Sequence, residues 1–468
     1  MHNVTEHIGR IRQFDVVVVG SGVSGSAAAM TAARAGAKVA LLEKLDTYGG
    51  SAALSAGMFW TAPDLEAYQK RIPLGDAELG ARLIQDYPEA LAELRASGVR
   101  VATEPQLDIM TFGIGYSTDI KAILAWCRNE VVAASGEART NAPVVDLVHN
   151  GRRVTGAIVR EHDDTLTRYD AAAVILTTGG FQGARDKLTR YIGPNADRLL
   201  LRSNPGSVGD GLRLARGAGA GGTKAMSTFY GHLIGSPVKR FEPEDYLPYS
   251  QYYSGSTVLV NLRGERFADE TQGDELLNQA LTFQPEARGI LIFDHHVRVT
   301  EGTEEPFPGL GTIDRYAIAV EAGATHAEAS TLAELIDAVA AWGVDKVNLI
   351  ATLDRYKAAV VSGGGVARGV AVAPTARGPQ TGPFYALMVQ PSITFTFGGI
   401  RTDERGRVLD HDGHPVPGLY AAGADIGGLS NYGYAGGLAP GYITGRWAGE
   451  SAARATSHQV PADAAFAV

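Results

Sequence analysis

A fully apolar run followed by glycines and an alanine-rich helical pattern is the first regular feature of this sequence. Residues 15–19 read Asp-Val-Val-Val-Val, a β-branched run typical of a strand buried on both faces. The glycine-rich stretch Gly20–Gly25 follows, then a helical pattern over 26–35 and a second apolar strand over 38–42, which ends at Glu43. This order predicts a strand, a tight turn, a helix and a second, parallel strand.

The glycines of this stretch have the spacing G-x-G-x-x-G, which indicates a dinucleotide site when it lies between a strand and a helix. Gly20 allows the tight turn, Gly22 lets a pyrophosphate approach the backbone, and Gly25 lets the helix pack closely on the strand. The helix start offers free N–H groups and a partial positive charge to the phosphates. Glu43 is the expected acceptor for the ribose hydroxyls.

The same alternation of strand and glycine turn returns later in the chain. Residues 171–176 form an apolar strand followed by a glycine turn over 177–181, and residues 418–425 repeat strand, glycine and acid near the chain end. A segment of small residues, 48–57, follows the second strand, and an alanine-rich helix is predicted over 442–454. These elements favour an α/β domain assembled from both ends of the chain.

The pattern lapses in the middle of the chain. A strand is predicted over 257–261 and helices over 313–321 and 331–342, and an aromatic stretch over 241–254 precedes them. No internal repeat accompanies these elements.

These segments together resemble the FAD-binding type shared by fumarate reductase and succinate dehydrogenase flavoproteins, 3-ketosteroid dehydrogenases and tricarballylate dehydrogenase-like enzymes. The resemblance covers about residues 15–222 and 383–453, with 258–270 between them. It implies an α/β fold in which residues 1–226 and 383–468 form a Rossmann-type FAD-binding domain. Residues 227–382 would form an inserted α+β cap, or substrate, domain.

The resemblance also implies which residues hold FAD. Glu43 matches the ligand of the adenosine ribose, Val145 the residue whose backbone meets adenine, and Asp425 the acid at the ribitol. The full predicted set is Gly20, Gly22, Ser24, Gly25, Glu43, Lys44, Gly49, Gly50, Ser51, Ser55, Gly57, Val145, Thr178, Gly179, Asp210, Gly423, Asp425 and Leu438. Non-covalent FAD is expected, because the segment 48–57 contains no histidine to carry a covalent bond. No second G-x-G-x-x-G lies between a strand and a helix, so electrons are expected to pass to an unidentified acceptor instead of a nicotinamide.

The charged residues that hold a dicarboxylate in fumarate reductases are missing here, although carboxylates need such donors. The segment Arg266–Glu270 matches their R-F-x-x-E, but no arginine follows over 271–274. The stretch 394–399 lacks their histidine, and Tyr434 stands where an arginine precedes a Gly-Gly pair. Dicarboxylate reduction is therefore disfavoured.

Tyr434 instead resembles the tyrosine of the Y-P-G-G segment in ketosteroid dehydrogenase relatives, with Ala435 in place of the proline. The resemblance implies that the Tyr434 hydroxyl and the Gly437 N–H hold a ketone oxygen and stabilise the enolate. A tyrosine base takes the α-proton, the β-hydrogen leaves as hydride to flavin N5, and an α,β-unsaturated ketone forms. Tyr252 and Tyr253 are the first candidates for the base, and Tyr230 and Tyr116 rank below them.

The predicted function is thus an FAD-dependent desaturation of a 3-ketosteroid or similar neutral cyclic ketone next to its carbonyl. One alternative is a tricarballylate-like polycarboxylate substrate, which would require Arg202, Arg263 or Arg288 at the flavin. A second is a fumarate reductase-type ene-reductase, and a third, outside catalysis, is a flavin-binding electron sensor.

Composition excludes several other classes. The net charge of −9 and the lack of basic runs argue against nucleic acid or anionic membranes as partners. Cys127 is the single cysteine, so no intrachain disulfide or thiolate cluster can form, and the histidines lack metal-ligand spacing. No apolar run is long enough to span a bilayer, and residues 1–13 are polar, unlike a signal peptide. A cytoplasmic protein with a small-molecule substrate is expected, and its oligomeric state stays open.

Overall fold

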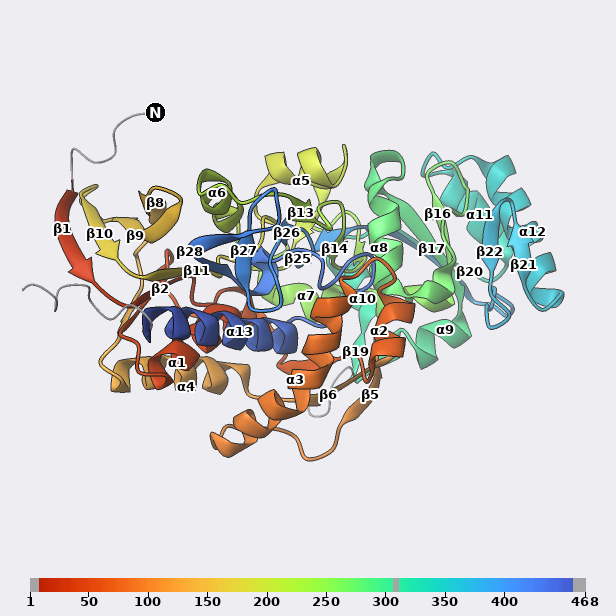
Figure 1. Cartoon of the computed structure of the whole chain (residues 1–468). Coiled ribbons are helices and arrows are strands. Elements are labelled where there is room, and N and C mark those ends of the chain that lie inside the picture. Colours follow the sequence, from red (N-terminus) through yellow and green to blue (C-terminus); the bar gives the residue numbers. More distant parts are fainter. Residues whose placement is uncertain (1–7, 306–310, 458–468) are drawn as a thin grey trace, which may run out of the picture. The chain divides into compact units, whose positions relative to one another are not determined.

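The computed structural model describes residues 8–305 and 311–457, and it divides into two compact units (Figure 1). The first unit holds the chain up to Ala184, the segment Asn204–Thr228, and the chain from Phe395 onward. The second unit holds Arg185–Ser203 and Phe229–Thr394. The first seven residues, part of the polar N-terminal stretch, lie outside the described residues.

These units differ in their boundaries from the domains expected from the sequence, which met at residues 226 and 383. Strand β23 (Phe384–Gln390) pairs along its whole length with β17 (Gly289–Asp294) and so groups with the second unit. Strand β12 (Leu200–Leu201) pairs with β24 (Ser392–Ile393), which brings the segment around residue 200 into the same unit. These two pairings link residues far apart in sequence, which is why the sequence alone did not indicate them.

The first unit is built on a six-stranded sheet in the order β27-β28-β11-β2-β3-β7. Its strands are β2 (Val16–Val19), β3 (Val39–Leu42), β7 (Glu137–Arg139), β11 (Ala173–Leu176), β27 (Arg407–Leu409) and β28 (Pro415–Ala421). All pair in parallel except β27, which is antiparallel at one edge. The predicted α/β, Rossmann-type fold is therefore confirmed.

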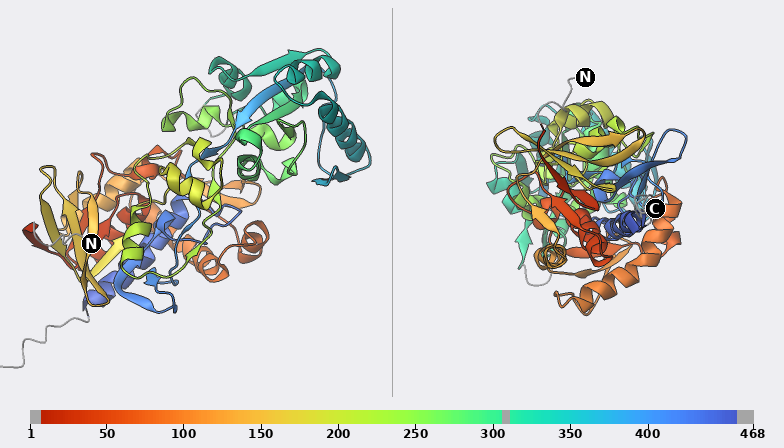
Figure 2. Two further views of the ribbon diagram at one scale, coloured as in Figure 1. Left: turned by 90° about the horizontal axis from the view of Figure 1, so that it is seen from above. Right: turned by 60° about the vertical axis from the view of Figure 1, so that its left-hand side comes forward.

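Two alanine-rich helices pack side by side against this sheet, α1 (Val23–Arg34) and α13 (Leu438–Ser457) (Figures 1 and 2). Their small residues lie in one buried cluster with Val16, Val18 and Ile175 of the strands. Helix α13 begins four residues before the predicted start at 442, because Pro440 is tolerated in the first turn of a helix.

Other elements complete the first unit. A four-stranded sheet has the order β1-β10-β9-β8 and a three-stranded sheet the order β4-β6-β5. Their strands are β1 (Ile8–Gln13), β4 (Met58–Thr61), β5 (Gln106–Ile109), β6 (Gly113–Ser117), β8 (Val144–Asn150), β9 (Arg153–Arg160) and β10 (Leu166–Asp170). The remaining longer helices are α2 (Leu65–Arg71), α3 (Ala77–Ala96), α4 (Ile120–Ala133) and α6 (Asp210–Gly217).

The second unit contains an antiparallel sheet in the order β15-β23-β17-β16, and β20 (His326–Ala329) also pairs with β23. Strands β15 (Ile234–Gly235) and β16 (Val258–Asn261) are short and buried. Helices α8 (Asp274–Thr282), α9 (His295–Thr300) and α10 (Arg315–Glu321) share one apolar cluster with Leu259 and Leu291. Helices α11 (Leu332–Ala340) and α12 (Lys346–Val361) share another with Val260 and Ile292. Because alternate residues of a strand face opposite sides, both faces of this sheet are buried.

Among the described residues, none of the helices combines the length and apolarity that a bilayer crossing requires.

Candidate functional site

The first glycine turn has the geometry that its spacing predicts. Gly20 has a φ of +101°, and a Cβ added there would lie 2.4 Å from the Thr177 carbonyl oxygen. A Cβ at Gly25 would lie 1.9 Å from the carbonyl oxygen of Gly20. At Gly22, in contrast, the nearest described atom would be the Gly49 oxygen, at 4.0 Å. Gly20 and Gly25 are thus required by the protein itself, whereas Gly22 leaves open space at the start of α1.

The start of α1 also keeps its donors available. Gly22 is the N-cap residue, and no described side chain caps the first N–H groups. Free N–H groups at a helix start attract anions. An open space above such donors fits a pyrophosphate.

Glu43 is held rigidly at the end of β3. Its Oε2 accepts hydrogen bonds from the Ser21 N–H at 2.9 Å and from the Ser21 hydroxyl at 2.8 Å, and its Oε1 accepts from the Leu45 N–H at 3.0 Å. The Ser21 hydroxyl in turn accepts from the Gly49 N–H. Hydrogen bonds from the glycine turn therefore fix the orientation of the Glu43 carboxylate. A fixed orientation is consistent with its predicted role as acceptor for the ribose hydroxyls.

The remaining predicted cofactor residues of the N-terminal half lie around this turn. Gly49 and Gly57 have φ values of +108° and +87°, and Gly50 precedes Ser51 in a 3₁₀ turn. The Ser51 hydroxyl accepts from the Asn204 N–H at 3.2 Å, and the Ser55 hydroxyl from the Gly57 N–H at 3.1 Å. Lys44 and Asp210 form a half-exposed ion pair at 2.7 Å.

Val145 lies at an irregularity of the β8–β9 pairing, between the paired residues Val144 and Asp146. Its carbonyl oxygen accepts from Arg213 at 3.0 Å. Because this residue is outside the regular ladder, its backbone fits the predicted contact with a base.

Asp425 joins the C-terminal turn to the loop after β11. This buried carboxyl accepts from the N–H and the hydroxyl of Thr178, the latter at 3.0 Å, and from the Gly180 N–H at 3.4 Å. Burial raises the pKa of Asp425 to about 6. A Cβ at Gly423 would lie 2.4 Å from the Ser24 hydroxyl, so the last turn also contacts the first. The two distant glycine turns therefore meet in one place, together with Gly179.

Tyr434 and Gly437 converge just before α13. A Cβ built on Gly437 would lie 3.0 Å from the Tyr434 hydroxyl oxygen. The Tyr434 ring is buried between Trp60, at a centroid distance of 5.1 Å and edge-on, and Phe397, at 6.2 Å and stacked. Packing on two sides fixes the ring and keeps its hydroxyl close to Gly437, the residue before Leu438 at the helix start.

The second unit separates the two tyrosines that ranked first as bases. Tyr253 lies in the apolar cluster with Phe293, and its buried hydroxyl has no hydrogen-bond partner among the described residues. Burial raises the pKa of Tyr253 well above 10, which disfavours it as a proton acceptor. Tyr252 is half-buried, and its ring lies edge-on to His232 at 4.6 Å and beneath the Arg315 guanidinium at 4.3 Å.

The structure brings Tyr230, His232 and Asp274 into one hydrogen-bonded triad, which the sequence did not reveal. His232 is buried, its Nε2 lies 2.7 Å from the Tyr230 hydroxyl, and its Nδ1 is hydrogen-bonded to Asp274 Oδ2. Oδ1 of Asp274 accepts from the Ser254 hydroxyl at 2.9 Å and from the Leu233 N–H at 3.3 Å. Because Asp274 is already an acceptor toward two donors, we assign Nδ1–H as the third donor and Nε2 as the acceptor for the Tyr230 hydroxyl.

The electrostatics of the triad favour a neutral imidazole. Burial lowers the pKa of His232 well below 6.5, and the charges of Arg202 and Arg315 lower it further. Burial raises the pKa of Asp274 to about 7. The nearly closed environment thus disfavours the ion pair in the resting protein, and the neutral imidazole leaves Nε2 able to accept a hydrogen bond from the Tyr230 hydroxyl.

Two features of the sequence relate to this triad, but neither indicates that the three residues lie together. Tyr230 and His232 have the two-residue spacing that places side chains on one face of an extended strand. Asp274 ends the stretch 271–274, in which the arginine of fumarate reductases is missing. The pairing of the two segments depends on the fold.

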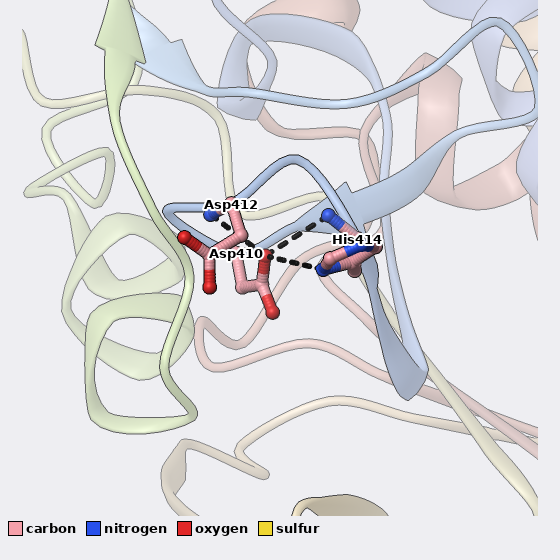
Figure 3. A group of neighbouring side chains, drawn as sticks. All are labelled: Asp410, Asp412 and His414. Carbon is pink, nitrogen blue, oxygen red and sulfur yellow. Dashed lines mark hydrogen bonds and ion pairs between the residues drawn. The ribbon is translucent and has the colours of Figure 1, made fainter.

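A further group of acidic and histidine side chains, Asp410, Asp412 and His414, lies in the hairpin between β27 and β28 (Figure 3). The Asp410 carboxylate accepts from the N–H groups of Asp412 and His414, at 3.0 and 2.9 Å, and pairs with Arg152. Asp412 and His414 are exposed. The hydrogen bonds that form the hairpin turn are sufficient to explain why these three side chains lie close together.

Comparisons of this chain with family models, curated proteins and solved structures all find FAD-binding flavoproteins. The family described as FAD binding domain matches residues 15–438. NADH:fumarate oxidoreductase of Klebsiella pneumoniae (strain 342) is 27% identical over 95% of this chain, which spans only 48% of that longer protein. 4-oxocyclohexanecarboxylate 2-dehydrogenase of Sinomonas cyclohexanicum is 27% identical over 92% of each chain. The structure of a 3-ketosteroid-Δ4-(5α)-dehydrogenase from Rhodococcus jostii RHA1 shares the fold, with a TM-score of 0.73 and 22% identity over 96% of this chain and 98% of that one.

Proposed function

This chain belongs to the family of FAD binding domains, and from that premise we propose that it interconverts a CH–CH bond and a C=C bond next to a ketone carbonyl. FAD is its cofactor, and the chain is a flavoprotein of the oxidoreductase class. The observation that carries the proposal is the convergence of the Tyr434 hydroxyl on Gly437 within an aromatic enclosure.

The role of Tyr434 and Gly437 is to bind the carbonyl oxygen of the substrate. Removal of a proton α to a carbonyl places negative charge on that oxygen, and two fixed donors stabilise this charge more than they stabilise the neutral ketone. Trp60 and Phe397 hold the phenol ring in position before the substrate arrives. Bound FAD supplies the acceptor for the β-hydrogen as hydride, or its donor in the reverse direction.

We assign the proton transfer to the Tyr230–His232–Asp274 triad. In the desaturating direction the Tyr230 oxygen takes the α-proton while its own proton moves to Nε2 of His232. Asp274 stabilises the imidazolium that results, as a carboxylate does in other triads. In the reverse direction the same groups return the proton to the α-carbon, so the triad serves an ene-reductase equally well.

A ring ketone is the preferred substrate class, and the name of the Sinomonas relative agrees with it. The name of the Klebsiella relative favours the ene-reductase direction as the second candidate. The tricarballylate-like alternative remains a rival, and the physiological electron acceptor and the strictly non-covalent state of FAD remain predictions.

Anaerobic reduction of the bound flavin by a panel of cyclohexanones, 3-ketosteroids and tricarboxylates tests this function. We expect bleaching with ketones, and we expect Tyr434→Phe to lower the reduction rate by about 10²–10³-fold while the flavin stays bound, as for loss of one oxyanion donor. The ketone mechanism would be contradicted if only the tricarboxylates reduced the flavin, or if Tyr434→Phe reduced it with ketones at the wild-type rate.

The acid sensitivity of cofactor binding follows from Asp425. Burial raises the pKa of this carboxyl to about 6, so the cofactor-free protein loses the charge as the pH falls through 6. A ribitol hydroxyl donates to the ionised form and lowers that pKa again, so FAD binding releases a proton below pH 6. We expect the Kd for FAD to rise about tenfold per pH unit below 6 and to be flat above 7. Titration of Asp425→Asn across the same range should lose this slope; an unchanged slope would contradict the assignment.

A further inference from the structure

Arg202 is a buried cation, and two of its guanidinium nitrogens lack a hydrogen-bond partner in the part of the chain that the structure describes. It follows β12, is 3% exposed, and its Nε and Nη1 atoms have no hydrogen-bond partner among the described residues. Its guanidinium lies over the Tyr246 ring at 4.9 Å. An unpaired charge in a buried site is costly, because neither water nor a counter-ion compensates it.

Arg315, in the same unit, is a buried arginine whose guanidinium makes several hydrogen bonds. This residue is fully buried, and its guanidinium donates to the carbonyl oxygens of Leu247 and Ser250 and to the Glu304 carboxylate. These four hydrogen bonds hold loops together, which is a structural role. The Nε and Nη1 atoms of Arg202 have no such partners among the described residues, and this difference from Arg315 makes Arg202 a candidate for binding a ligand.

The backbone places Arg202 beside the triad. The Arg202 N–H donates to the Ile393 oxygen at 2.8 Å, and the neighbouring Ser392 is hydrogen-bonded to the backbone of His232. Ser392 is also held by the Asn278 side chain of α8, the helix that begins with Asp274. The charge of Arg202 acts on both His232 and Asp274.

Asp274 is an acid whose charge interacts with that of Arg202, but the hydrogen bonds of its oxygens go to other residues. These oxygens accept from His232, Ser254 and Leu233. The guanidinium therefore keeps its donors for an anion from outside the chain.

We propose that Arg202 binds a carboxylate of the substrate, which makes the preferred substrate a keto acid or its unsaturated form and not a neutral ketone. This inference rests on the proposed function for the identity of the reacting ketone, but the carboxylate site stands on Arg202 itself. A carboxylate satisfies two N–H groups of a guanidinium at once, and charge-assisted bonds of this kind are among the strongest in proteins.

Equilibrium binding to the FAD-loaded protein tests the site without turnover. The probes are cyclohexanecarboxylate, which lacks the ketone, and 4-oxocyclohexanecarboxylate, each compared with its methyl ester by calorimetry. The wild type should bind each acid at least about tenfold more tightly than its ester. Arg202→Gln should weaken the acids on the order of a hundredfold and leave the esters unchanged, the scale of a lost buried charge pair. The matched control Arg355→Gln, at an exposed arginine of α12, should change neither.

Thermal unfolding of Arg202→Met separates binding from folding. Removal of an uncompensated buried charge should leave the Tm of the ligand-free protein unchanged or raise it by a few degrees. A loss of about 5 °C or more would show a structural role and overturn the proposal, as would acids that bind no better than their esters. If the acids bind tightly but do not reduce the flavin, the proposed carboxylate site is supported and the proposed reaction is contradicted.

Discussion

Replacement of Tyr230 by phenylalanine should lower kcat by about 10²–10⁴-fold, the range for loss of a general acid–base group. The phenol oxygen is the end of the triad, 2.7 Å from His232 Nε2, and phenylalanine keeps the ring while removing the atom that carries the proton. The bound flavin and its spectrum should be unchanged. Single-turnover flavin reduction under anaerobic conditions measures the effect.

Asp274→Asn tests whether the three residues act as a unit. An amide that donates to Nδ1 of His232 favours the tautomer with the proton on Nε2, which can no longer accept from Tyr230. The loss in kcat should be comparable to that of Tyr230→Phe, and the double variant should be no slower than either single one, because residues of one proton path are not additive. Independent, multiplicative losses would contradict the triad.

Substitutions of two further tyrosines test whether the loss of activity is specific to Tyr230. Tyr249→Phe removes a hydroxyl from α7 (Tyr246–Tyr249), outside the triad, and should retain full activity. Tyr252→Phe distinguishes Tyr252, a base expected from the sequence, from Tyr230, the base proposed here. If Tyr252→Phe were inactive and Tyr230→Phe active, the proton transfer would have to be reassigned.

Gly22→Ala should produce a folded protein that no longer retains FAD. Its Cβ would meet no described atom closer than 4.0 Å, so the apoprotein should unfold at nearly the wild-type temperature. The same methyl group occupies the space in which the pyrophosphate approaches the backbone. We expect the Kd for FAD to rise on the order of a hundredfold, equivalent to about 3 kcal/mol. Fluorescence titration of the apoprotein with FAD measures it.

Gly25→Ala provides the opposite case within the same turn. A Cβ there would lie 1.9 Å from the Gly20 oxygen, which is backbone and cannot move aside. Overpacking of this kind should lower the unfolding free energy by about 3 kcal/mol or more. Gly217→Ala, where a Cβ meets nothing within 4 Å, is the control and should be neutral. Equal FAD affinity in Gly22→Ala and wild type would remove this turn from the cofactor site.

The cofactor half of the molecule could be predicted because its constraints are local. A buried strand, a turn with positive φ and a helix packed at contact distance each constrain adjacent residues, so the need for glycine at positions 20 and 25 could be predicted. The role of Glu43 at the ribose stays a prediction. Asp425 was also identified, because the same strand-and-turn pattern precedes it, although its contact with Thr178 joins residues far apart in sequence.

By itself, the sequence determined the α/β class and the glycine turns, since these follow from periodicity and from steric limits on a few neighbouring residues. The wider set of residues expected to hold FAD came from the family resemblance of the sequence. Only the tertiary structure singled out the proposed acid–base group and the cation proposed to bind the substrate. His232 and Asp274 are 42 residues apart and become a pair only when the segment before β15 and the start of α8 are packed together. Whether an arginine is satisfied, as Arg315 is, or left with free donors, as Arg202 is, depends on partners and burial that no local pattern encodes.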